Sequence, residues 1–231
     1  MKIKFNNHLF ILFLVVFIMN ELLLAQDWAN LNRFKDDNKK VGQPSPYENR
    51  IVFMGNSITQ GWIEQRPQFF SDKPFINRGI SGQTTPQMLL RFRQDVVDLN
   101  PKVVVILAGT NDIAGNTGPS TLEMILDNLK SMSEISKANG IKVILCSVLP
   151  AFDYPWRPGQ NPNEKIPQLN KMIENYCIEN ELIYLDYFSA MVDERNGLPE
   201  KYSGDGVHPN SEGYKVMEPL VENAIEKALS N

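Results

Sequence analysis

The chain has 231 residues, of which 42% are hydrophobic, and its formal net charge at pH 7 is −4. A length of this order is sufficient for one domain with a complete hydrophobic core. A mildly acidic chain without a block of Lys or Arg binds the phosphate backbone poorly, so we expect no nucleic-acid partner.

Residues 1–25 have the pattern of a secretory signal peptide. Two lysines give a basic start, an apolar run extends from Leu9 to Met19, and the small Ala25 precedes polar sequence. The apolar run is too short for a comfortable bilayer span. We therefore expect cleavage after Ala25, a secreted or periplasmic single domain over residues 26–231, and no stable membrane anchor. An uncleaved N-terminal anchor is the alternative.

Beyond the leader, short apolar runs alternate with amphipathic segments. A short N-terminal helix is expected around Trp28, Leu31 and Phe34, packed on the outside of the domain. The apolar runs are typical of buried parallel strands and lie at 51–54, 75–77, 103–108, 143–147 and 182–185. The amphipathic segments predict helices at 85–99, 120–138, 165–180 and 210–229. This alternation predicts a flavodoxin-like, three-layer α/β/α sandwich around a five-stranded parallel sheet.

Unusual polar residues follow the carboxyl ends of the predicted strands. Ser57 follows the first strand, Gly82 the second and Asn111 the third, while Asp205 and His208 follow the fifth. Each has a purely structural explanation by itself, such as a helix cap or a turn. Ligands bind at this edge of parallel α/β sheets, so the shared position favours one common site.

His208 is the one histidine of the sequence outside the leader, and Asp205 lies three residues before it. A serine hydroxyl becomes an effective nucleophile when a base takes its proton and a carboxylate orients that base. We therefore expect Ser57 to be the nucleophile, His208 the base and Asp205 the orienting carboxylate. Activity should fall below about pH 6, where protonation of an imidazole removes the base.

Four short segments carry a resemblance to a known family. In chain order they are Gly-Asn-Ser-Ile-Thr at 55–59, Asn-Arg-Gly-Ile-Ser-Gly at 77–82, Gly-Thr-Asn-Asp at 109–112 and Asp-Gly-Val-His at 205–208. In this order they are similar to the four sequence blocks of the SGNH (GDSL-type) hydrolases, and the resemblance covers about residues 50–229. The chain looks nearest to bacterial relatives of the platelet-activating-factor acetylhydrolase branch. Asn56 stands where the namesake motif has an aspartate, and Ile58 where it has a leucine.

The resemblance implies the SGNH hydrolase fold and a serine esterase. It assigns the oxyanion hole to the backbone N–H groups of Ser57 and Gly82 and to the side-chain amide of Asn111. Loss of one such donor lowers the rate by roughly 10²–10³ in hydrolases of known mechanism. The sequence also lacks a phosphate-binding loop, a dinucleotide fingerprint and a His–Cys metal cluster, so we expect no metal and no cofactor.

The stretch 150–167 departs from the strand–helix rhythm and contains five prolines, which predicts a long loop after the fourth strand. Tyr154 and Trp156 are candidates for stacking on a sugar ring, and Arg157 for binding an anionic or hydroxyl group. The alternative is a surface loop that is packed by its own aromatic residues.

These features favour a serine esterase that removes short O-acyl groups, above all acetyl, from a small-molecule or glycan ester. A lysophospholipase or aryl-esterase of the same fold is one alternative, and a non-catalytic carbohydrate-binding module is another. Cys146 and Cys177 are expected to be buried thiols, with a disulfide as the alternative. The sequence leaves the oligomeric state open.

Overall fold

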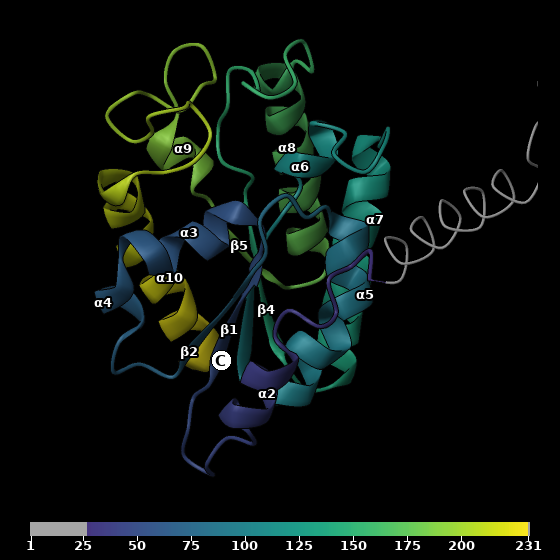
Figure 1. The fold of residues 1–231 in the computed structure, drawn as a ribbon, viewed down its shortest axis with the longest axis vertical. Coiled ribbons are helices and arrows are strands. Elements are labelled where there is room, and N and C mark those ends of the chain that lie inside the picture. The colour runs from purple at the N-terminus through teal and green to yellow at the C-terminus, as the bar shows by residue number, and fades with distance from the viewer. Residues whose placement is uncertain (1–26, 231) are drawn as a thin grey trace, which may run out of the picture.

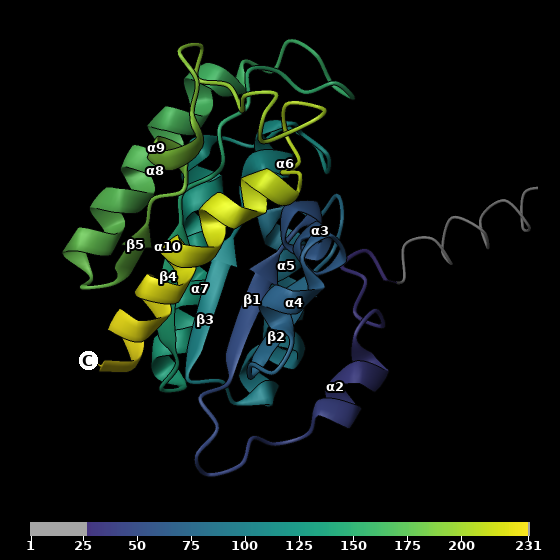
Figure 2. The same ribbon diagram turned by 90° about the vertical axis from the view of Figure 1, so that its left-hand side faces the viewer.

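The computed structural model describes residues 27–230, so the predictions for the leader lie outside the described residues. Its centre is an all-parallel sheet of five strands (Figure 1), and their order across the sheet is β2-β1-β3-β4-β5 (Figure 2). The strands are β1 (Ile51–Gly55), β2 (Phe75–Gly79), β3 (Val103–Leu107), β4 (Lys142–Cys146) and β5 (Ile183–Leu185). They lie where the apolar runs predicted them, and β1 and β3 are buried along their whole length. Such burial is typical of parallel strands that are covered on both faces.

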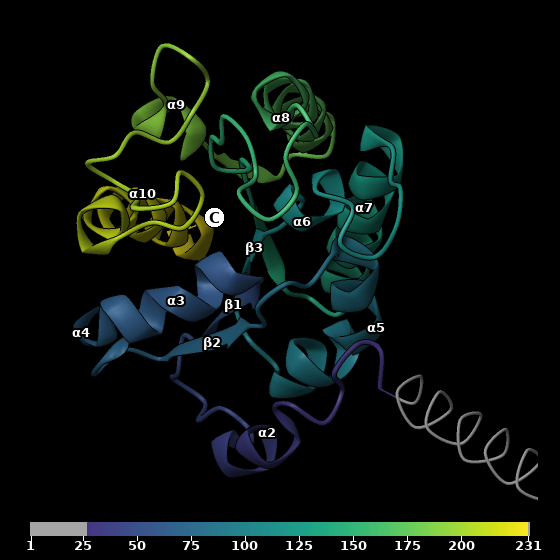
Figure 3. The same ribbon diagram turned by 45° about the horizontal axis from the view of Figure 1, so that its top comes forward.

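Helices cover both faces of the sheet, which confirms the predicted three layers (Figure 2). They are α2 (Lys35–Val41), α3 (Ser57–Gln65), α4 (Pro67–Phe70), α5 (Thr85–Asp95), the 3₁₀ turn η1 (Val97–Leu99), α6 (Thr110–Ile113), α7 (Leu122–Ala138), α8 (Pro162–Glu179), α9 (Phe188–Met191) and α10 (Ser211–Ser230). Helices α5, α7 and α8 pack on one face of the sheet, and α3, α4 and α10 pack on the other (Figure 3).

The sheet divides the apolar core into two clusters. Because side chains alternate along a strand, Val52 and Met54 of β1 face α5 and α7, whereas Phe53 faces α3 and α4. On the second side, Trp62 stacks against Phe69 with ring centroids 5.0 Å apart. The two clusters fix the helices over the sheet, and with them the loops at its carboxyl edge.

Two local predictions differ from the structure. The N-terminal helix α2 begins at Lys35, so Trp28 and Leu31 lie in turns before it. The long loop after β4 ends at residue 161 and not at 167. Pro162 occupies the first turn of α8, where its missing N–H leaves no hydrogen bond unmade and its fixed φ suits the helix.

Cys146 and Cys177 are both free and buried, which confirms the prediction of thiols over that of a disulfide. Burial raises the pKa of Cys177 to about 12. Burial likewise raises the pKa of Cys146. Both side chains are therefore protonated and inert at neutral pH. In the described part of the chain, none of the helices combines the length and the apolar run that a bilayer crossing requires.

Candidate active site

Ser57 lies at the carboxyl end of β1, where the chain turns directly into α3. Asn56 caps this helix, because its side-chain Oδ1 accepts a hydrogen bond from the N–H of Ile58 at 3.0 Å. An amide oxygen caps a helix about as well as a carboxylate. Asparagine can therefore perform this capping in place of the aspartate of the namesake motif, with Ser57 as the first residue of the helix.

The structure brings the three predicted catalytic residues together in a hydrogen-bonded series. Ser57 Oγ lies 2.9 Å from His208 Nε2, although the two residues are 151 positions apart in the sequence. His208 Nδ1 lies 2.6 Å from Asp205 Oδ2. This is the order of contacts in which a base can take a proton from serine while a carboxylate fixes its other ring nitrogen.

Asp205 is held by more than the imidazole. Its second carboxylate oxygen accepts hydrogen bonds from the N–H groups of Val207 at 2.9 Å and His208 at 2.8 Å, and from the Ser203 hydroxyl at 3.0 Å. Partial burial acts to raise the pKa of Asp205, but the bonds from the His208 backbone and ring and from Val207 outweigh it and lower the pKa to about 2. The carboxylate is therefore charged at neutral pH and can stabilise an imidazolium.

A pocket of about 220 Å³ opens beside Ser57. Its lining contains the predicted oxyanion residues and four others: Ser57, Ser81, Gly82, Asn111, Asn116, Trp156 and His208. Gly82 has a φ of +77°, a left-handed conformation that favours glycine. Asn111 is buried, and its Nδ2 donates one hydrogen bond to the Gln83 carbonyl at 2.9 Å. An amide nitrogen carries two N–H donors, so a second one remains for a ligand.

The third predicted donor is the backbone N–H of Ser57. It belongs to the first turn of α3, whose N–H groups have no acceptor within the helix. The helix dipole adds positive potential at the same end. The structure thus places Ser57, Gly82 and Asn111 around one pocket at a position suited to a developing negative charge.

Asn116 contributes to the site and was missed by the sequence analysis. Its Nδ2 donates to the Gly82 carbonyl, and its Oδ1 accepts from Trp156 Nε1, each at 3.2 Å. Asn116 therefore connects the loop of Gly82 to the loop of Trp156. The asparagine lies in a turn-rich segment where this residue type is common, so no local signal sets it apart.

Arg91 is a second residue that sequence reasoning missed, and it holds in place the backbone segments that carry the site. Its fully buried guanidinium donates to the carbonyls of Gly55 at 3.0 Å and Arg78 at 2.9 Å, and to Gln83 Oε1 at 2.6 Å. It thereby joins the ends of β1 and β2 to the loop that receives the Asn111 amide. Burial lowers the pKa of Arg91 to about 10, so it stays charged at neutral pH, paired with Asp95. Their spacing of four residues on one helix was the available signal.

Asp112 links two elements of the site and was also missed. This buried carboxylate accepts hydrogen bonds from the N–H of Thr85 at 2.9 Å and from its hydroxyl at 2.6 Å. It therefore ties α6, which carries Asn111, to the start of α5, which follows the loop of Gly82. Burial raises the pKa of Asp112 to about 6, against the hydrogen bonds from Thr85, which lower it.

The predicted substrate rim requires a correction at Tyr154. This side chain is fully buried, and its hydroxyl lies 2.8 Å from the Thr110 hydroxyl, so its ring cannot stack on a ligand. It instead stacks under Trp156 with ring centroids 5.1 Å apart. Trp156 is 44% exposed, and its ring centroid lies 6.0 Å from that of His208. Arg157 is exposed, and its Nη1 donates to the Gly115 carbonyl at 2.8 Å.

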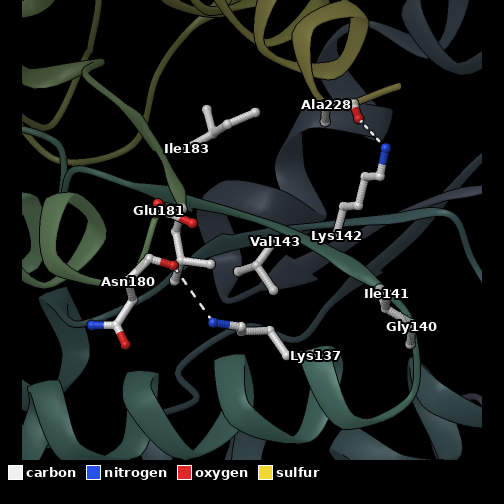
Figure 4. Close-up of a pocket in the computed structure, with 10 residues that line it drawn as sticks. Lys137, Gly140, Ile141, Lys142, Val143, Asn180, Glu181, Ile183 and Ala228 are labelled. Atoms are coloured by element: carbon white, nitrogen blue, oxygen red, sulfur yellow. Dashed lines mark hydrogen bonds between the residues drawn. The ribbon is translucent and has the colours of Figure 1, made fainter. Parts of the chain in front are cut away.

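A larger pocket of about 380 Å³ lies at the amino ends of β4 and β5, away from the carboxyl edge that carries Ser57 (Figure 4). Its two lysines contact carbonyls near helix ends. Lys137 Nζ donates to the Asn180 carbonyl at 3.5 Å, and Lys142 Nζ donates to the Ala228 carbonyl at 2.7 Å. Lysine side chains commonly satisfy carbonyls at helix C-termini, so these contacts have a structural explanation. Across residues 27–230, no group of three or more His, Cys, Asp or Glu side chains is arranged to hold a metal ion.

Comparison with known proteins supports this description. The profile of the GDSL-like Lipase/Acylhydrolase family matches residues 53–216. A solved structure of a GDSL-like lipase from Bacteroides thetaiotaomicron is 50% identical, with a TM-score of 0.85 over 87% of this chain and 98% of that one.

Two curated proteins are similar at lower identity. An acetylxylan esterase from Xylanibacter ruminicola is 27% identical over 222 residues, which cover 79% of this chain but 45% of that longer protein. A platelet-activating factor acetylhydrolase IB subunit beta homolog from Drosophila melanogaster is 27% identical over 133 residues, or 53% of each chain. The family profile covers most of this chain, and the chain folds around a five-stranded parallel sheet. The chain therefore belongs to the GDSL-like lipase/acylhydrolase (SGNH) family of carboxylic ester hydrolases.

Proposed function

We propose that the enzyme removes short acyl groups, chiefly acetyl, from carbohydrate, and that Ser57, His208 and Asp205 form its catalytic triad. The observation that carries this proposal is the contact of Ser57 Oγ with His208 Nε2 at 2.9 Å beside a pocket lined by Gly82 and Asn111. A non-catalytic binding module has no need for such an arrangement of nucleophile, base and carboxylate.

The proposed reaction proceeds through an acyl-enzyme. Ser57 Oγ attacks the ester carbonyl while His208 Nε2 takes its proton, and Asp205 stabilises the imidazolium that forms. The N–H groups of Ser57 and Gly82 and the Asn111 amide donate to the oxyanion. Collapse of the tetrahedral intermediate breaks the bond to the alcohol oxygen, which takes the proton from His208. Water then attacks the acyl-enzyme with His208 again as base, and the carboxylic acid leaves Ser57 free.

Three observations favour a short acyl group on a sugar. The pocket at the oxyanion donors is small, about 220 Å³. Trp156 offers a half-exposed aromatic face next to the base, and aromatic faces suit sugar rings. A relative with detectable sequence identity is an acetylxylan esterase. Hydrolysis of lysophospholipids or aryl esters is the second candidate, because the family resemblance does not fix the substrate.

The first test is kcat/KM on 4-nitrophenyl esters from acetate to decanoate, measured for the wild type and for Ser57→Ala. We expect a preference for acetate and a loss of at least ~10⁴-fold in Ser57→Ala, because the residual rate of triad mutants comes from binding and the oxyanion hole alone. Circular dichroism would establish that the variant is folded. A preference for decanoate would favour the lysophospholipase, and full turnover by folded Ser57→Ala would exclude the mechanism.

We also propose that the enzyme acts outside the cytoplasm, since residues 1–25 have the layout of a signal peptide. Expression of the full chain in a Gram-negative host should give a periplasmic protein whose first residue is Gln26. Intact mass and N-terminal sequencing measure this directly. Recovery of the intact chain in the membrane fraction would favour an uncleaved anchor.

A further inference from the structure

A second pocket, of about 260 Å³, shares Ser57, Ser81 and His208 with the oxyanion pocket but extends in another direction. We call it the α3 pocket. Its lining comes from α3 and from the segment that leads into α10, whereas the lining of the oxyanion pocket includes Asn111 of α6 and Trp156. The residues that line it are Ser57, Gln60, Gly61, Glu64, Gln65, Ser81, His208, Pro209 and Tyr214.

One face of α3 supplies the polar side of this pocket. Ser57, Gln60 and Glu64 stand at positions i, i+3 and i+7, which share a helix face. Gln60 Nε2 donates to Glu64 Oε1 at 3.1 Å, and Gln60 Oε1 accepts from the N–H of Ser81 at 2.9 Å. Gln60 is therefore fixed at both ends of its amide, and it holds the Glu64 carboxylate on the side of the nucleophile.

Gly61 lies in the lining of the pocket, where α3 comes close to Tyr214 of α10. A Cβ at this position would lie 3.0 Å from the Tyr214 hydroxyl, which is already bonded to the Ile58 carbonyl at 2.8 Å. Glycine inside a helix costs roughly 0.5–1 kcal/mol relative to alanine, so its presence here needs a local cause. The close approach of Tyr214 provides that cause.

The lining decides which part of an ester fits the α3 pocket. A carboxylate accepts hydrogen bonds only, so a ligand that contacts Glu64 must bring O–H or N–H donors. An acyl chain has none, so it gains no hydrogen bond from this exposed carboxylate. A sugar has several hydroxyl donors. His208 must also protonate the departing alcohol oxygen, which requires the alcohol part to lie against this residue.

We infer that the α3 pocket is the subsite for the sugar ring that carries the scissile ester, that it takes a neutral sugar, and that Glu64 determines this specificity. The face of Trp156, which lines the other pocket, is then left for a neighbouring ring of the glycan. The inference rests on the proposed esterase function. The negative charge of Glu64 attracts hydroxyl donors and repels ligands that carry a carboxylate or phosphate. The same charge disfavours an anionic glycan next to the scissile ester.

The test compares Glu64→Gln with the wild type on two glycans, a neutral acetylated xylo-oligosaccharide and an anionic acetylated oligogalacturonide. Glutamine keeps the size of the side chain and one acceptor oxygen but removes the charge. 4-Nitrophenyl acetate, which has no sugar hydroxyls, gives the reference rate for each protein. Glu226→Gln serves as the matched control, because Glu226 is an exposed glutamate in the last turns of α10, at the end of that helix away from the α3 pocket.

We expect Glu64→Gln to lower kcat/KM for the neutral glycan and raise it for the anionic one, so that their ratio falls about tenfold, mainly through KM. The control should retain the wild-type ratio. An unchanged ratio in an active Glu64→Gln enzyme would overturn the subsite while leaving the esterase intact. If the wild type hydrolyses no acetyl ester, the proposed function and this inference are both wrong.

Discussion

Asn111 shows how one buried side chain can have two tasks. Its amide donates to the Gln83 carbonyl at 2.9 Å and lines the pocket beside Ser57. The first bond fixes the orientation of the amide, and the remaining N–H can then point at a transition-state oxygen without reorganisation. Preorganised donors of this kind are among the largest contributors to acyl-transfer catalysis.

We expect Asn111→Ala to lower kcat on 4-nitrophenyl acetate by roughly 10²–10³, with a much smaller change in KM, because the oxyanion forms after binding. Steady-state kinetics measure the change. Thermal unfolding of the variant separates a catalytic loss from a folding loss, since the bond to Gln83 is removed as well. A variant with wild-type kcat would remove Asn111 from the oxyanion hole.

Among the elements, the short helix α6 depends on α5 for its position. The carboxylate of Asp112 in α6 accepts hydrogen bonds from both the N–H and the hydroxyl of Thr85, the first residue of α5. Asn128 of α7 also donates to the Thr85 hydroxyl at 3.0 Å. A four-residue helix has little stability of its own, so this buried contact determines where Asn111 lies.

The buried Asp112 should make stability depend on pH. Its pKa of about 6 in the folded state lies above the usual value of 3.8, so the folded protein binds this proton more tightly than the unfolded chain. The contribution of Asp112 to the unfolding free energy should therefore decrease as pH rises from about 4 to 6, by roughly 2–3 kcal/mol, and stay constant above that range.

Urea unfolding of the wild type and of Asp112→Asn over pH 4 to 7 measures this contribution. Asparagine cannot titrate, so the difference between the two proteins should change in that window. If the substitution only weakens hydrogen bonding, the curves of unfolding free energy against pH for the two proteins should be offset by a constant amount. Such parallel curves would show that the carboxylate is not destabilised by burial.

On the scale of the whole molecule, stability comes from the two apolar clusters and function from the edge of the sheet between them. Trp62, 1% exposed, stacks on both Phe69 and Tyr214 and belongs to the cluster beneath α3 and α10. Trp156 is 44% exposed and lies over the site. We therefore expect the tryptophan at position 62 to contribute to stability and the one at position 156 to contribute to substrate binding.

Replacement of each tryptophan by alanine should separate these contributions. Trp62→Ala should lower the unfolding free energy by about 3–5 kcal/mol, because it leaves a large cavity. Trp156→Ala should lower it by about 1 kcal/mol or less and should reduce kcat/KM on acetylated glycans more than on 4-nitrophenyl acetate. Denaturant unfolding and the two assays test this. Equal stability losses would contradict the division.

Much of the fold and of the site was predictable from sequence, because both depend on local patterns. The apolar runs have the length of typical strands, and the predicted helix at 210–229 is present as α10, where the Asn210 side chain accepts hydrogen bonds from the N–H groups of Glu212 and Gly213. Parallel strands bring their carboxyl ends to one edge whatever loops join them. That rule alone predicted that Ser57, Asn111 and His208 lie close together.

The sequence by itself determined the strand–helix alternation and the residues expected to form the triad, but it left a disulfide between the two cysteines open until the structure showed both to be free. Tertiary structure decided the rest. It buried Tyr154 beneath Trp156, placed Arg91 under three chain segments, and opened the α3 pocket between Glu64 and Tyr214. Secondary structure follows from periodicities along the chain. Burial and pocket shape depend on contacts between residues far apart in sequence, and no local pattern encodes these.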